Sequence, residues 1–277
     1  MAEEIELPII DHIPEPMNPI PKLIFIVPYR DREQHQQFFA NHMRTILEDM
    51  KESDYKIYYI EQNDTRGFNR GAMKNIGFLM VKAVYPYDYK DITLVFNDVD
   101  TMPFTKNFLD YETTVNNVKH FYGYTFTLGG IVSIKGGDFE KVGGFPNFWA
   151  WGYEDNALQR RVLAANMVID RSQFYPFMDK NIFQMKDGLS RTVNRSEFER
   201  YMSDTNEGFS NLRNIEYTIN HETGFVNVTQ FDTGIPEAPE TNAIHLLSNG
   251  AYPFKTDAVV LSKGNNRRRA NMSMVIL

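Results

Sequence analysis

Two acids separated by one residue, Asp98 and Asp100, follow a short apolar stretch of the sequence. Alternate side chains of an extended segment point to the same side, so both carboxylates can face one crevice. Two hard oxygen ligands there could hold Mg²⁺ or Mn²⁺ against a diphosphate. An Asp-x-Asp pair is also common in ordinary turns, so the pair alone leaves both interpretations open.

Arginines stand in two further polar stretches, VPYRDR and RGFNRGAMKNIGF. Arg30 and Arg32 follow an apolar run and can point the same way, and guanidinium groups suit a phosphate or the edge of a nucleobase. Arg66 and Arg70 flank the start of a predicted helix, where free N–H groups favour an anion. Solvated surface arginines, and capping of that helix by Asn69, are the structural alternatives.

The only two tryptophans, Trp149 and Trp151, stand just before Glu154 and Asp155 in the stretch WAWGYEDN. The dipole of a helix stabilises acids in its first turn, which explains the carboxylates but not the indoles. Indole faces stack on sugar rings, and a carboxylate beside a bound sugar hydroxyl can act as a general base. The stretch therefore indicates a carbohydrate site, and glycines such as Gly152 would let the loop close over a ligand.

The elements that must position these groups follow from hydrophobic periodicity. Short apolar runs predict buried strands at 23–27, 55–62 and 92–96. Apolar residues at helical spacing predict helices at 32–50, 69–83 and 154–166. The alternation of strand and helix implies right-handed crossovers and a parallel sheet, whose ligands bind beyond the carboxyl ends of the strands. The VPYRDR and NDVD stretches both fall there.

The pattern weakens beyond residue 120. Residues 129–152 are glycine-rich and expected to be mobile, and residues 214–231 predict a β-hairpin around 222–224. In the helix that starts at Glu154, the residues expected to face inward are Leu158, Val162, Leu163 and Met167. We divide the chain into an extended, proline-rich lead-in (1–21), a catalytic domain (22–236) and a C-terminal extension of unknown role (237–277).

Bulk properties exclude several classes of function. The net charge of −7 argues against a protein that binds nucleic acid through its phosphates. The absence of cysteine excludes disulfides and thiolate zinc sites. The N-terminus is acidic without an apolar core, and no apolar run approaches the length of a membrane span. We therefore expect a soluble, cytoplasmic protein.

Six stretches of the chain resemble, in the same order, segments of the β-1,4-galactosyltransferase superfamily. They are VPYRDR, FNRGAMKNIGF, NDVD, GGIVSI, GGFPNFWAWGYEDN and VTQFDTGIP, within residues 22–236. The resemblance implies an α/β fold of the GT-A type, with a mostly parallel central sheet flanked by helices. It also implies inverting transfer of a hexose or N-acetylhexosamine from a UDP-sugar to a hydroxyl of a glycan or glycoconjugate, with Mn²⁺ or Mg²⁺. Without the family's cysteines and membrane anchor, the chain looks like a soluble viral or microbial relative.

The same resemblance implies roles for individual residues. Asp155 would be the catalytic base, assisted by Glu154. The donor would be bound by Pro28, Tyr29, Arg30, Arg32, Phe68, Arg70, Asp98, Val99, Asp100, Trp151 and Gly152. The acceptor would be bound by Tyr124, Trp151, Glu154 and Asp155. The metal ligands would be Asp100, Met185 and Asp187.

The chain departs from the family's pattern at three places. Asn156 replaces the third acid of the Glu-Asp-Asp motif, and no histidine stands among the candidate metal ligands near Met185. Thr127 stands where relatives often carry an aromatic ring that restricts the donor to galactose. We therefore expect a donor with a bulkier C2 substituent, such as UDP-GalNAc, to be accepted at least as well as UDP-galactose.

Two alternatives to a glycosyltransferase stay open at this point. A catalytically weak protein on the same fold could bind a nucleotide sugar or a glycan, and Asn156 and the missing histidine favour it. A phosphotransferase with Asp98 as nucleophile would also place Asp-x-Asp after a strand. That motif requires Thr or Val two residues after the second Asp, and Met102 at this position disfavours it.

Overall fold

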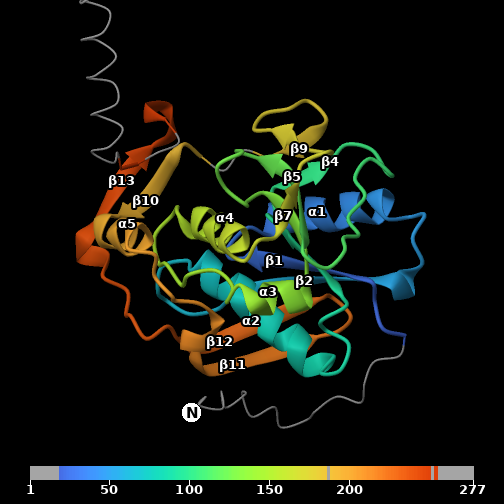
Figure 1. Cartoon of the computed structure of the whole chain (residues 1–277), viewed down its shortest axis with the longest axis horizontal. Coiled ribbons are helices and arrows are strands. Elements are labelled where there is room, and N and C mark those ends of the chain that lie inside the picture. The colour runs from blue at the N-terminus through green and yellow to red at the C-terminus, as the bar shows by residue number, and fades with distance from the viewer. Residues whose placement is uncertain (1–18, 186–187, 251–252, 255–277) are drawn as a thin grey trace, which may run out of the picture.

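A mixed β-sheet forms the centre of the molecule in the computed structural model, which describes residues 19–185, 188–250 and 253–254 (Figure 1). Nine strands of these described residues belong to the sheet. In spatial order eight of them are β11 (Arg213–Asn220), β12 (Phe225–Asp232), β2 (Tyr55–Gln62), β1 (Leu23–Tyr29), β3 (Thr93–Asn97), β6 (Ile131–Lys135), β5 (Asn117–Gly123) and β7 (Val168–Asp170). The ninth, β8 (Tyr175–Pro176), pairs with β5 off this path.

The middle strand, β1, has the sequence LIFIVPY and is buried over its whole length. Such continuous apolar runs are typical of strands that are covered on both faces. β1 pairs in parallel with β2 and β3, and β12 joins β2 in parallel. β6 then pairs antiparallel with both β3 and β5, which makes the sheet mixed toward that edge.

Helices cover both faces of this sheet. The α-helices are α1 (Glu33–Ile46), α2 (Arg70–Val84), α3 (Gly136–Lys141), α4 (Glu154–Ala164) and α5 (Arg195–Met202). Phe25 of β1 shares a buried cluster with Phe39 and Met43 of α1. Ile24, on the opposite face of the same strand, shares the other cluster with residues of α2, α3 and α4, such as Leu158. The predicted α/β architecture is therefore confirmed.

α2 lies unusually close to the sheet, and its position matters because it carries Arg70. Asn69 caps the helix by accepting a hydrogen bond from the backbone N–H of Ala72. A Cβ placed on Gly77 would lie 2.6 Å from Cγ2 of Ile26, so only a glycine allows this approach to the strands. All but three residues of α2 are buried, which leaves the helix little freedom to shift.

Two small two-stranded sheets accompany the main sheet. β4 (Thr101–Pro103) pairs with β9 (Ile182–Gln184), and β10 (Ser190–Asn194) pairs with β13 (Asn242–Leu246). Figure 1 shows β10, β13 and α5 gathered at one side of the molecule. The short 3₁₀ turns are η1 (Glu52–Asp54), η2 (Phe209–Asn211), η3 (Pro239–Thr241) and η4 (Leu247–Asn249). Among the described residues, no helix has the length and apolar character needed to cross a bilayer.

The strong local patterns are confirmed, including the three strands, the first helices and the β11–β12 hairpin. The predicted mobility of the glycine-rich segment 129–152 stays a prediction; β6 and α3 occupy its first half, and most of its residues are buried. One expectation is wrong. Leu163 does not face inward, because 54% of it is exposed on the outer side of α4.

The predicted boundaries at residues 21 and 236 stay predictions. Residues 1–18 of the lead-in and 255–277 of the C-terminal extension lie outside the described residues. The described part of that extension includes β13, which pairs antiparallel with β10 through five residue pairs.

Candidate functional site

A cavity of about 620 Å³ opens beyond the carboxyl ends of β1 and β3, and we call it the main cavity. It brings together nearly all side chains that the sequence analysis singled out. Those that line it are Pro28, Arg30, Arg32, Phe68, Arg70, Asp98, Val99, Asp100, Tyr124, Trp151, Gly152, Glu154, Asp155 and Met185. Thr127 and Asn156 line it as well.

Two ion pairs between α2 and α4 form one wall of the main cavity. Nε of Arg70 donates to Oε1 of Glu154 at 3.2 Å, and Nζ of Lys74 donates to Oδ1 of Asp155 at 2.9 Å. Asp155 also lies against the backbone of Gly129, where an added Cβ would be 2.3 Å from its Oδ2. The helix start thus holds both acids in fixed positions, and both residues line the cavity.

The environments of these two acids push their pKa values apart. Burial raises the pKa of Asp155 to about 7 against the charge of Lys74, and the negative charges of Glu154 and Asp98 add to the rise. Burial also raises the pKa of Glu154, but the charges of Arg70 and Lys74 outweigh it, so the net shift is downward. One acid is therefore a fixed anion, and the other can exchange a proton near neutral pH.

A buried oxygen of Glu154 has no hydrogen-bond partner within the described structure. Its Oε2 is buried, while Oε1 is engaged by Arg70. A buried acceptor without a donor costs about 1–3 kcal/mol, so a ligand hydroxyl placed there would gain a strong contact. Glu154 lines the main cavity, and this oxygen is therefore a candidate acceptor for a ligand.

Asp98 and Asp100 occupy another wall, at the end of β3. The backbone N–H of Asp98 donates to the carbonyl of Gly130, and burial raises the pKa of its carboxyl, with Lys74 opposing. Oδ1 of Asp100 accepts from the Thr101 hydroxyl at 2.9 Å, and Oδ2 lies 3.6 Å from an Arg32 nitrogen. The predicted Asp-x-Asp pair is thus brought to the cavity.

Met185 lies next to Asp100, as its predicted role as a metal ligand requires. Its backbone N–H donates to the carbonyl oxygen of Asp100 at 2.8 Å. Asp187, the third predicted ligand, lies outside the described residues. Within the described residues, no group of three His, Cys, Asp or Glu side chains could hold a metal ion by itself. Hard cations are often held by one or two carboxylates plus ligand phosphates, so Asp100 fits a cation shared with a diphosphate.

The two tryptophans have different surroundings although one residue separates them. Trp149 stacks on Phe231, with ring centroids 5.6 Å apart, and its Nε1 donates to the carbonyl of Ile235. Trp151 lines the main cavity, and its backbone N–H donates to Thr192 of β10 at 2.7 Å. The second indole is therefore the one placed to stack on a ligand in the main cavity.

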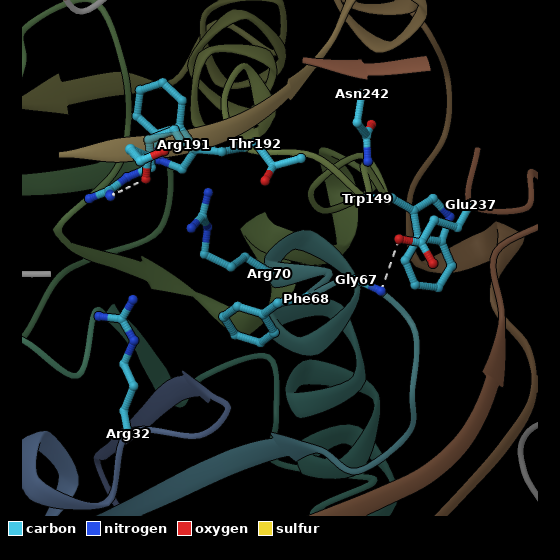
Figure 2. Close-up of a pocket in the computed structure, with 11 residues that line it drawn as sticks. Arg32, Gly67, Phe68, Arg70, Trp149, Arg191, Thr192, Glu237 and Asn242 are labelled. Carbon is cyan, nitrogen blue, oxygen red and sulfur yellow. Dashed lines mark hydrogen bonds between the residues drawn. The ribbon is translucent and has the colours of Figure 1, made fainter. Parts of the chain in front are cut away.

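A side cavity of about 380 Å³ adjoins the main one, and Figure 2 shows its lining. Both cavities are bordered by Arg32, Phe68, Arg70, Trp151 and Arg191. In Figure 2 the Arg70 side chain lies between the ring of Phe68 and the backbone of β10. Three guanidinium groups around one space provide the donors and positive charge that an anionic ligand needs.

Among the described residues predicted to bind the donor, Tyr29 is the one that lines neither cavity. It is 6% exposed and packs edge-on against Phe225, with ring centroids 5.4 Å apart. The reason is strand alternation: Tyr29 and Phe25 face the α1 side of the sheet, whereas Pro28 lines the main cavity.

Sequence reasoning missed the residues that complete the cavity. Phe126 and Phe177 each stack on Tyr124, with ring centroids 5.1 and 5.2 Å away, and we call these three rings the aromatic shelf. Asn156 fixes this shelf because its Nδ2 donates to the carbonyl of Phe126 at 3.1 Å. Lys74 was missed because a lysine in an apolar helix suggests a surface position, although its spacing of one turn from Arg70 was visible.

The chain matches sequence models of known families over most of its described length. Residues 10–111 match the N-terminal region of glycosyl transferase group 7, and residues 110–186 match the N-terminal domain of galactosyltransferase. β-1,4-Galactosyltransferase 4 of Cricetulus griseus is 29% identical over 239 residues, which cover 80% of this chain and 67% of that relative. β-1,4-Galactosyltransferase 5 of Mus musculus is 28% identical over 75% of this chain and 55% of its own length. The chain thus spans roughly half to two thirds of these relatives.

Solved structures share the fold. The catalytic domain of Drosophila β1,4-galactosyltransferase 7 in complex with xylobiose superposes with a TM-score of 0.61 at 19% identity, covering 80% of this chain and 98% of that one. A mutant of that enzyme in complex with manganese, UDP-Gal and xylobiose gives a TM-score of 0.59 at 18% identity, with the same coverage. The fold is therefore of the GT-A type. With both family models matched in order along one such fold, the chain belongs to the β-1,4-galactosyltransferase family.

Proposed function

We propose that this protein transfers a hexose or N-acetylhexosamine from a UDP-sugar to a hydroxyl of a sugar acceptor, with inversion at the anomeric carbon. The observation that carries the proposal is Asp155, a fixed carboxylate with a pKa of about 7 in a cavity that Asp98 and Asp100 also line. The curated relatives are named galactosyltransferases, and one structural neighbour is a complex with manganese, UDP-Gal and xylobiose. Both facts support this choice of substrates.

The diphosphate of the donor would bind between the arginines and Asp100. Arg32 and Arg70 border both cavities and offer guanidinium groups that suit phosphate oxygens, and Phe68 offers a flat face for the base. Mn²⁺ or Mg²⁺, held by Asp100 and Met185 and, as predicted, Asp187, would supply neutralisation of charge on the departing diphosphate. Family relationship and the contact between Asp100 and Met185 support this cation.

Asp155 would act as the general base. Its carboxylate accepts the proton of the acceptor hydroxyl while the hydroxyl oxygen forms a bond to the anomeric carbon. The bond from that carbon to the diphosphate oxygen breaks, and its electron pair leaves with UDP. Attack from the face opposite UDP inverts the configuration. Glu154 stays anionic, and its unpartnered Oε2 is available to a hydroxyl of the bound sugars.

Sugar rings would be held by stacking. Trp151 and the aromatic shelf line the main cavity, and flat aromatic faces suit the apolar faces of sugars. Asn156, in place of the family's third acid, supports the shelf through the Phe126 carbonyl, so its presence does not argue for lost catalysis.

A protein that binds a nucleotide sugar or glycan without turnover is the second candidate. The observation that favours it is the small number of metal ligands, since the described residues contain no group of three His, Cys, Asp or Glu side chains that could hold a metal ion. A cation bound weakly would neutralise the leaving diphosphate poorly, while the arginines could still hold a nucleotide.

The test is UDP release from UDP-galactose and UDP-GalNAc with Mn²⁺, over acceptors that end in glucose, N-acetylglucosamine or xylose, with the product identified by mass spectrometry. Acceptor-dependent UDP release and a product with inverted configuration are expected. If calorimetry shows tight binding of a UDP-sugar but no UDP is released, the protein is a binding protein without turnover, which is the second candidate. Absence of both binding and release would reject the family's activity for this chain.

A further inference from the structure

Lys74 is a buried lysine at the floor of the main cavity. Its side chain is 3% exposed, and Nζ lies 4.6 Å from the centroid of the Phe145 ring. An ammonium group removed from water costs several kcal/mol unless it is paired, so a lysine in such a place needs a strong partner. That partner is Asp155, whose Oδ1 is 2.9 Å from Nζ.

Each of the two acids at the start of α4 contacts one cation of α2. Arg70 and Lys74 are one turn apart on α2, and Glu154 and Asp155 are adjacent at the start of α4. Arg70 contacts Glu154, and Lys74 contacts Asp155. α2 packs closely on the 145–148 segment, since a Cβ on its Gly71 would lie 2.1 Å from a backbone carbonyl there, and most of the helix is buried. Lys74 is thereby held against the carboxylate.

The other charges that face Asp155 act in both directions. Glu154 of α4 and Asp98 at the end of β3 are negative, and together with burial they favour the protonated acid. Lys74 and Arg70 of α2 are positive and favour the anion. The Gly129 segment contributes backbone only at this point. Lys74 is the cation in direct contact with Asp155, so it bears most directly on its ionisation.

We propose that Lys74 is a positioning residue for the base: its ammonium fixes the orientation of the Asp155 carboxylate and favours its ionised form, against the burial and the neighbouring acids that favour the protonated form. The proposal deepens the proposed glycosyl transfer and rests on it for its consequence in catalysis. Lys74 itself stays protonated, because Asp155, Asp98 and Glu154 together overcome burial and raise its pKa.

Replacement of Lys74 by Met removes the charge and keeps much of the volume. The pKa of Asp155 must rise, since two acids and burial then act on it with less opposition. We expect kcat at pH 7 to fall by about tenfold or more, because each unit of pKa shift removes about tenfold of the ionised base. The acid limb of the pH profile should move to higher pH, so activity recovers toward pH 9, and the KM for the UDP-sugar should change little.

Two matched variants complete the kinetic test. Lys74→Arg keeps the charge and should restore the wild-type pH profile, even where its larger head lowers the rate. Lys82→Met removes a lysine two turns further along α2, where it pairs with Glu140 away from both cavities, and should leave the profile unchanged. A Lys74→Met enzyme whose activity falls equally at every pH would overturn the proposal.

A second measurement does not depend on activity. The pKa of Asp155 in the folded protein is about 7, above its value of 3.8 for an unperturbed carboxyl, so the folded state holds the proton longer. Stability contributed by this group is therefore present below pH 4 and lost as pH rises to about 7. With Lys74→Met the folded pKa is higher, so the loss should continue above pH 7.

Thermal unfolding of Lys74→Met and of Lys74→Met/Asp155→Asn, measured from pH 5 to 9, isolates this effect. The single variant should lose Tm progressively above pH 7, and the double variant, which lacks the carboxyl, should not. Equal, pH-independent losses in both would show that Lys74 is only structural and would overturn the proposal. If the wild type releases no UDP, the proposed function fails, while this comparison still decides the role of Lys74.

Discussion

Two walls of the main cavity each carry a pair of carboxylates, but the protein treats the two pairs differently. Glu154 and Asp155 each have a cation from α2 within 3.2 Å. Asp100, on the Asp98 wall, has a hydroxyl at 2.9 Å and an arginine nitrogen at 3.6 Å. Charge is compensated by the chain itself where a proton would move. Where a diphosphate would bind, the arginine beside Asp100 also borders both cavities, so Asp100 would share that cation, and a metal ion, with the ligand.

This difference explains why the wall with Glu154 and Asp155 gives sharper expectations than the wall with Asp98 and Asp100. A carboxylate held by a buried ion pair keeps its position whether or not a ligand is bound. A carboxylate that shares a cation with a substrate acquires its full role only in the complex. Substitutions of Glu154 or Asp155 should therefore affect the reaction step. Substitutions at Asp100 should affect binding of the metal and of the donor together.

The largest effect should come from Asp155→Asn. The amide cannot accept the acceptor's proton, so transfer should fall by about 10²–10⁴-fold while UDP binding persists. Steady-state rates and calorimetric titration with UDP give the two quantities, and Asp110→Asn, at a residue whose side chain is 69% exposed, is the matched control. Near-normal turnover by Asp155→Asn would remove Asp155 from the role of base and reduce the contrast between the walls.

The next effect concerns the Asp98 wall. Removal of divalent cations with EDTA, and Asp100→Asn, should each lower transfer by roughly 10²-fold, since a metal stabilises a leaving diphosphate by several kcal/mol. Titration with Mn²⁺ should restore the EDTA-treated enzyme fully and Asp100→Asn only in part. Full activity without metal would leave Asp98 and Asp100 with hydrogen-bonding roles alone.

A smaller effect is expected at the aromatic side of the main cavity. Thr127 lines this cavity, and its hydroxyl donates to the carbonyl of Tyr124 at 3.3 Å. Thr127→Tyr should fill the space beside the donor's C2 substituent and lower the preference for UDP-GalNAc over UDP-galactose by about 10–200-fold. Thr125→Tyr, at an exposed position in the same loop, is the control. An unchanged donor ratio would mean that residue 127 lies outside the C2 pocket.

The smallest effect should follow Asn156→Asp. The carboxylate cannot donate to the Phe126 carbonyl, so the aromatic shelf loses a contact worth about 1 kcal/mol. We expect the KM for the acceptor to rise by a few-fold with little change for the donor, and Asn63→Asp at an exposed position to have no effect. If the donor and acceptor KM values rise together, Asn156 does not act through the shelf.

The sequence predicted the parts of the fold whose signals are local. The apolar run at β1 and the helical spacing of α2 specify their own structure, and the NDVD and VPYRDR stretches follow strands that meet at one edge. Tyr29 shows the limit of that reasoning: a motif brings residues together, but strand alternation decided that its ring packs on Phe225. β6 and α3 were missed because glycines usually indicate loops. Here a glycine allows close packing instead, since a Cβ on Gly136 would lie 2.0 Å from the carbonyl oxygen of Tyr89.

Long-range pairing accounts for the contacts at the site that the sequence alone does not reveal. Lys74 contacts Asp155, which is 81 residues further along the chain, and no local sequence pattern predicts a contact between residues so far apart. Met185 reaches Asp100 because β9 pairs with β4, two strands of three residues each that have no periodicity to detect. The ordered motifs indicated which side chains belong to the site. The ion pairs between α2 and α4, which influence the pKa values of the two acids, became visible only in the folded structure.

The turn between Trp151 and the acids has a consequence for protein engineering. The chain crosses it through two residues with left-handed backbone, Gly152 at φ 105° and Tyr153 at φ 71°. A tyrosine in that conformation is strained by about 1–2 kcal/mol, and its ring is held against Phe198 of α5 at 4.8 Å. Glycine at Tyr153 would relax this strain, but it would also remove a buried ring from its cluster with Phe148 and Phe198, at a cost of about 3–5 kcal/mol that exceeds the strain. Packing therefore maintains the strained turn, and a substitution that relaxes it would both lower the stability of the protein and loosen the start of the helix that presents Asp155.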